Sequence, residues 1–136
     1  MAKLDLAPLL APSIAEIERL AANAFESLPA SFRTLCGDVI FCVEDFPASD
    51  VLADMQAEEF DILGLFEGIG IAQDSAVAET GRMPNRVYLY RRPILDYWAE
   101  FEETLGQIVT HVLVHELGHH LGLSDADMSA IEIQAN

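Results

Sequence analysis

Apolar residues recur at helical spacing in the segment that begins at Ser13. Ser13 and Glu16 have the spacing of a capping box, which starts many helices, and Pro29 follows the last apolar position. We therefore expect an amphipathic helix from Ser13 to about Leu28 that packs on a sheet. Its apolar stripe consists of Ile14, Ile17, Leu20, Ala21, Ala24, Phe25 and Leu28.

Three later segments have the composition of β-strands. Residues 39–43 are β-branched and apolar, which predicts a strand buried on both faces or nearly so. Residues 62–71 are apolar with several glycines, which indicate a bulge or a close backbone approach. Residues 86–91 alternate in polarity and predict a third strand that stops before Pro93. The small and polar residues 72–85 predict a surface loop.

Further helical patterns complete the chain. A short turn is expected at residues 32–35, and the tail from 127 to 133 has one apolar face. The longest pattern covers residues 101–121, where Leu105, Ile108, Val109, Val112, Leu113 and Leu117 keep helical period. Shorter helices are expected at residues 51–57, with Ser49 or Asp50 as the cap, and at residues 93–98. The order of elements predicts an α+β fold, in which the N-terminal helix packs on a small mixed sheet of about three to four strands.

The composition suits one globular domain spanning residues 1–136, because 51% of the residues are hydrophobic. A formal net charge of −16 disfavours nucleic acid and anionic membrane surfaces as partners, since phosphate contacts need Lys and Arg. No apolar run reaches the length of a membrane span, and the N-terminus does not resemble a signal peptide. We expect a cytoplasmic protein, with a monomer as the default state.

Two cysteines, Cys36 and Cys42, flank the first predicted strand. Their spacing matches no familiar zinc knuckle, and disulfides are rare in the cytoplasm. We expect two structural thiols.

The predicted helix near the C-terminus carries the residues with the clearest chemistry. His115 and His119 are four residues apart, so they lie on one helix face and can approach the same zinc ion. Glu116 is next to the first histidine, where its carboxylate can reach a water on the metal. Gly122 suits a left-handed cap, and a turn there can return Asp125 as a third ligand. Three protein ligands with an open fourth position are typical of catalytic zinc sites.

The remaining histidines and two tyrosines are weaker candidates. Three histidines in a row on one helix span roughly 12 Å, too far for one ion, so His111 is expected in the core or supporting a ligand. His120 points away from His119 and is expected to pack or lie at the surface. Tyr88 and Tyr90 are expected in the core of a strand, although a tyrosine can also donate to a tetrahedral intermediate.

The pattern HExxHxxGxxD formed by these residues resembles the metzincin motif HExxHxxGxxH, with Asp125 in place of the third histidine. The order of elements from about Leu28 to Glu132 is similar to that of the minimal bacterial zincin-like metallopeptidases. The resemblance implies a zincin-like fold whose C-terminal active-site helix carries HExxH. It implies Zn²⁺ held by His115, His119 and Asp125.

The same resemblance implies a hydrolase, a zinc metalloprotease acting as an endopeptidase on a peptide or protein substrate. Glu116 would then be the catalytic carboxylate, the general base for a zinc-bound water. Two other functions stay open. A non-catalytic zinc-binding interaction module does not need Glu116, and a metal-dependent endoribonuclease does not suit the charge of −16. The sequence does not indicate the substrate, and other divalent metals also suit these ligands.

Overall fold

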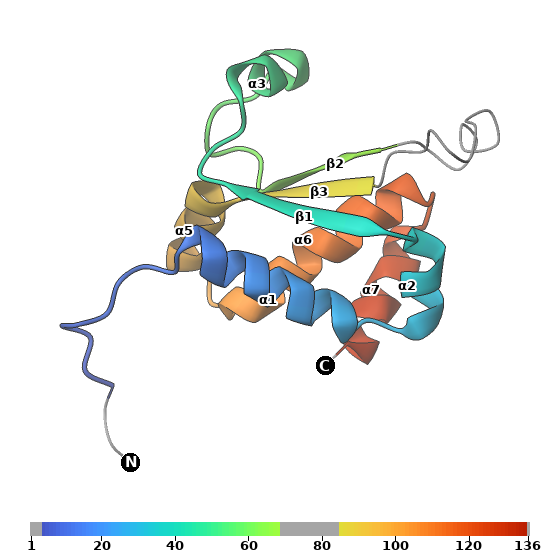
Figure 1. Cartoon of the computed structure of the whole chain (residues 1–136), viewed down its shortest axis with the longest axis horizontal. Helices are drawn as coiled ribbons and strands as arrows, with labels where there is room; N and C mark the ends of the chain where they lie inside the picture. Colours follow the sequence, from blue (N-terminus) through green and yellow to red (C-terminus); the bar gives the residue numbers. More distant parts are fainter. Residues whose placement is uncertain (1–3, 69–84, 136) are drawn as a thin grey trace.

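A small mixed sheet and the helices packed beneath it make up the computed structural model, which describes residues 4–68 and 85–135 (Figure 1). In the described residues the sheet has the strand order β1-β3-β2. Strand β1 is parallel to β3, and β2 is antiparallel to it. The elements are α1 (Ile14–Glu26), α2 (Ala30–Cys36), β1 (Val39–Glu44), α3 (Ser49–Met55), β2 (Gly64–Glu67), β3 (Asn85–Tyr90), α5 (Arg91–Glu100), α6 (Leu105–His120) and α7 (Asp125–Gln134). The predicted α+β fold is confirmed.

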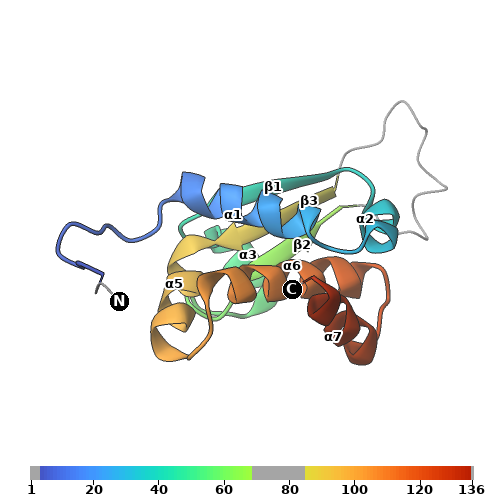
Figure 2. The same ribbon diagram turned by 90° about the horizontal axis from the view of Figure 1, so that it is seen from below.

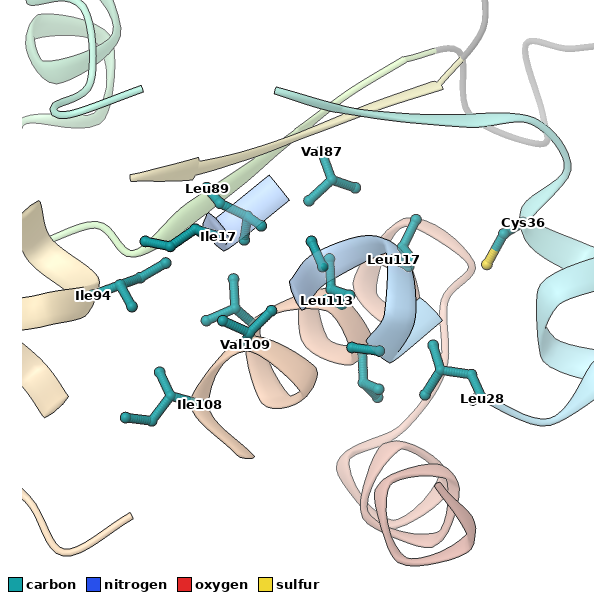
Figure 3. Packing of buried hydrophobic residues seen from close by; sticks show 14 of the residues in the cluster. Ile17, Leu28, Cys36, Val87, Leu89, Ile94, Ile108, Val109, Leu113 and Leu117 are labelled. Atoms are coloured by element: carbon teal, nitrogen blue, oxygen red, sulfur yellow. The ribbon is translucent and has the colours of Figure 1, made fainter. Parts of the chain in front are cut away.

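Helices α1 and α6 pack against each other below one face of the sheet (Figures 1 and 2). Helix α1 lies against β1 and α6 lies against β2, so the two helices cover the sheet from edge to edge. The core fills the space between these layers, and Ile17, Val87, Leu89 and Leu113 are completely buried in it (Figure 3). The helix that carries the histidines is therefore fixed along one whole side by apolar packing.

The N-terminal helix agrees with its prediction. The Ser13 hydroxyl accepts a hydrogen bond from the backbone N–H of Glu16, and the Glu16 carboxylate accepts one from the N–H of Ser13. This capping box starts α1 where the sequence indicated. Ile17, Ala21 and Ala24 form its buried stripe.

The prediction that residues 39–43 are buried on both faces is wrong. Strand β1 is at the edge of the described sheet and pairs only with β3 there. Val43 is buried, whereas Ile40 is 42% exposed on the face turned away from α1. The β-branched residues of this strand favour extended backbone, but helices cover only one of its faces.

Several element boundaries differ from the predictions. Residues 30–36 form a helix, not a short turn at 32–35, and α3 has Ala48 as its N-cap, so neither Ser49 nor Asp50 caps it. Helix α5 begins at Arg91 and includes Pro93, whose missing N–H lies in the first turn, where backbone donors have no helical partner.

Helices α6 and α7 begin at Leu105 and Asp125 because capping boxes precede them, Thr104 with Gln107 and Ser124 with Asp127. The second predicted strand is confirmed only as β2, residues 64–67. Residues 69–71 of that prediction, and residues 72–84 of the predicted loop, lie outside the described residues. Among the helices of residues 4–68 and 85–135, none is both long and apolar enough to cross a membrane.

The core packing of α6 gives a stability prediction. Leu113 is completely buried and Leu35 is 61% exposed, and both are in helices. We expect Leu113→Ala to lower the free energy of unfolding by about 2–5 kcal/mol, because it leaves a cavity. Leu35→Ala should change it by less than about 0.5 kcal/mol. Urea unfolding followed by circular dichroism measures both, and equal stabilities would contradict this account of the core.

Candidate metal centre

The end of α6 is a turn that sends the chain back along the same helix. Gly122 has a φ of +76°, a left-handed conformation that suits glycine. The Leu123 N–H donates to the Gly118 carbonyl at 2.9 Å, and the Gly122 N–H donates to the His119 carbonyl at 3.1 Å. These two bonds are those of a Schellman motif. The glycine cap predicted from the sequence is therefore present, and α7 begins three residues later.

Helices α6 and α7 lie next to each other (Figure 2), and they approach closely at Gly118 and Met128. Met128 is completely buried. A Cβ atom added at Gly118 would lie only 2.5 Å from the Met128 sulfur. The missing side chain at Gly118 therefore lets α7 lie directly against α6, with its acidic residues beside the histidines.

The structure brings together the three metal ligands predicted from the sequence. One ligand atom from each of His115, His119 and Asp125 lies within 4.8 Å of the other two. His115 is half-buried, while His119 and Asp125 are exposed. Ligand atoms about 2.1 Å from a tetrahedral zinc are roughly 3.4 Å apart, so this grouping is compatible with one ion. Two imidazoles and a carboxylate are a donor set that zinc prefers.

Glu116 lies on the side of α6 that faces β2. Burial raises the pKa of its carboxyl, and this effect is opposed by charge on His119 and by a hydrogen bond from the Phe66 N–H. The Tyr90 N–H donates a hydrogen bond to the Leu63 carbonyl, so the backbone groups of Leu63 face β3. Because these groups alternate in direction along a strand, those of Phe66 point away from β3, outward from the sheet. The carboxylate is therefore held between the edge of the sheet and the histidines.

His115 has a lowered pKa, caused first by burial and next by the charge of His111. Both effects favour the neutral imidazole at physiological pH, which is the form that binds a metal. The rings of His111 and His115 are 3.9 Å apart between centroids.

His111 does not belong to the core, so that alternative in its prediction is wrong. Its side chain is 57% exposed, and its Nδ1 lies 2.8 Å from Oε1 of Glu132. The other carboxylate oxygen of Glu132 lies 3.6 Å from Nε2 of His115. Glu132 thus contacts both His111 and His115, and the expected supporting role of His111 toward a ligand stays a prediction. Glu132 was not among the residues predicted from the sequence, because its position beside α6 depends on how α7 packs.

The other candidates have packing roles. The ring of His120 stacks on Phe66 at 3.9 Å between centroids, in agreement with its prediction. Tyr90 is completely buried, and burial raises its pKa to about 12. Tyr88 is half-buried and stacks beside Tyr90, so both tyrosines belong to the packing of β3. Cys36 and Cys42 are free thiols, as expected.

A cleft of about 460 Å³ opens beside the histidines. Among the residues of α6 that line it are His111, His115 and Glu116. The remaining wall combines apolar and acidic groups. These are Met55, Asp61, Ile62, Leu63, Gly64, Tyr97, Glu103, Ile108 and Val112. A cleft of this size accepts a few side chains of a ligand.

The fold and this site together define an α+β domain with a histidine- and carboxylate-rich centre on a helix beside a sheet edge. A family model described as zincin-like metallopeptidase matches residues 36–135, which include β1, the cleft and both helices of the centre. The chain belongs to this zincin-like metallopeptidase family. No curated protein matches it.

The contact between β2 and α6 predicts the effect of a small substitution. A Cβ atom at Gly64 would lie 2.5 Å from Cγ1 of Val112 and 3.0 Å from the Tyr88 carbonyl oxygen. We expect Gly64→Ala to lower the free energy of unfolding by about 1–3 kcal/mol, because it forces the strand and helix apart. Gly106→Ala is the control, since its nearest atom would be 4.0 Å away. Chemical denaturation compares them, and a Gly64→Ala variant as stable as the control would refute the close approach.

Proposed function

We propose that this protein is a zinc-dependent metallopeptidase that hydrolyses peptide bonds in a peptide or protein substrate. His115, His119 and Asp125 are the proposed zinc ligands, and Glu116 is the proposed general base. The observation that carries the proposal is the grouping of the three ligand atoms within 4.8 Å, beside a carboxylate that lines the cleft. Membership in the zincin-like family supports the same reaction class.

Bound zinc supplies Lewis acidity, which polarises a carbonyl and makes a water molecule more acidic. Glu116 accepts the proton of the attacking water and returns it to the leaving amine. Burial raises the pKa of Glu116, which makes its carboxylate a stronger base. The Phe66 N–H keeps the carboxylate oriented during this transfer.

The cleft supports a preference among substrates. Apolar side chains from α3, α5 and the segment before β2 form much of its wall, and Asp61 and Glu103 add negative charge. Together with the net charge of −16, this favours a segment with apolar and basic side chains over an acidic one. The same charge argues against RNA as a substrate.

Metal content tests the ligand assignment. We expect wild-type protein, purified without added metal, to hold about one zinc per chain by elemental analysis. His115→Ala should lose it, because the substitution removes one of the three proposed ligands. His120→Ala is a matched control that should retain zinc, since His120 stacks on Phe66. Zinc retained by His115→Ala would contradict the site.

The role of Glu116 is tested separately. We expect Glu116→Gln to bind zinc like wild type but to cleave a peptide library at least about 100-fold more slowly, because it lacks a proton acceptor. The control Glu100→Gln removes an exposed carboxylate from α5 and should leave cleavage unchanged. A wild-type protein that holds zinc but cleaves nothing would favour the non-catalytic zinc-binding module instead.

A further inference from the structure

A second set of metal-binding side chains lies one helical turn from the proposed zinc site. One ligand atom from each of His111, His115 and Glu132 lies within 4.8 Å of the other two, the same closeness as in the first set. We propose that these three residues form a second site for a divalent cation, which shares His115 with the zinc site proposed above. The inference rests on that proposed function only through the shared histidine.

The packing of α6 and α7 explains why two such sets exist. His111, His115 and His119 follow one another at four-residue spacing, so each neighbouring pair can chelate an ion from one helix face. Helix α7 runs back along α6 and adds one carboxylate to each pair. Asp125 is in its first turn, and Glu132 is seven residues, or about two turns, further along the same face.

The distances within the second set suit one small cation. The two oxygens of Glu132 lie 2.8 Å from Nδ1 of His111 and 3.6 Å from Nε2 of His115. The carboxylate thus already spans both imidazoles. Ligand atoms on a tetrahedral ion are roughly 3.4 Å apart, so an ion needs only a slight widening of the His111–Glu132 contact. Two imidazoles and a carboxylate suit zinc and similar metals.

The surroundings give an ion access to this second set. A hollow of about 330 Å³ adjoins His111 and Glu132, and Glu102 and Glu103 also line it. His111 is exposed, and the side chain of Glu132 is 22% exposed. The nearby carboxylates attract cations, and open space remains for a water molecule as the fourth ligand. The second site is therefore an open one.

Sharing of His115 has a direct consequence. An ion bound by His111, His115 and Glu132 occupies the imidazole that the first site needs. Binding of an ion in one set is therefore expected to weaken binding in the other, and the two positions are about one helical turn apart, near 5.4 Å.

Full-length protein stripped of metal and titrated with Zn²⁺ against a chromogenic chelator tests the second site. Co²⁺ titration followed by visible absorption gives a second readout, because tetrahedral binding produces strong bands. The variant His119→Ala/Asp125→Ala lacks two of the three ligands of the first site. We expect it to bind one ion per chain, and the addition of Glu132→Gln should weaken that binding by more than about 100-fold.

Matched variants separate this result from general damage. In the same background, His111→Ala should weaken binding as Glu132→Gln does, whereas Glu100→Gln should not change it. Circular dichroism shows that each variant is folded. The proposal is overturned if folded His119→Ala/Asp125→Ala binds no ion, or if Glu132→Gln leaves its affinity unchanged.

The reciprocal variant tests the first site independently. His111→Ala/Glu132→Gln retains His115, His119 and Asp125, so the proposed peptidase site predicts that it binds one Zn²⁺. If this variant binds no Zn²⁺ while His119→Ala/Asp125→Ala does, the second site is supported and the metal site of the proposed function is refuted. Binding by this variant alone would overturn the second site and leave the proposed function intact.

Discussion

The close packing of α7 on α6 at Gly118 and Met128 is the contact on which the candidate site depends. A side chain at Gly118 would collide with the buried Met128 sulfur, so this glycine sets how near the two helices lie. The Schellman turn at Gly122 reverses the chain direction, so that α7 packs against α6 at this contact. Without this contact between the helices, two histidines on α6 would face solvent with no carboxylate of α7 beside them. The grouping of the candidate metal ligands is therefore a property of a helix pair.

The sheet contributes the second half of the site. Gly64 has no side chain, and a Cβ atom there would collide with Val112, so the glycine lets β2 approach α6 closely. This approach covers part of Glu116 and gives it the Phe66 N–H as a partner. Partial burial raises the pKa of this carboxyl, so its carboxylate is a stronger base than an exposed one. The strand thus changes the pKa of a carboxyl that the helix alone would leave in solvent.

Neighbouring imidazoles in the row of three histidines disfavour one another's protonation. Helix α7 adds a carboxylate at each end of the row, through Asp125 and Glu132. The arrangement resembles two overlapping chelates more than one isolated motif. If both proposed sites exist, an ion bound in one would have a neighbouring set of ligands of the same chemical type.

The sequence by itself determined the local features. The periodicity of apolar residues predicted α1 and most of α6, and the spacing of His115, His119 and Asp125 predicted that they meet, because helix geometry and a glycine cap are local properties. Local patterns did not reveal that β1 is an edge strand, since strand order depends on distant pairing. Only the tertiary structure placed Glu132 beside His111. That contact joins residues 21 positions apart through the packing of two helices, which no local spacing specifies.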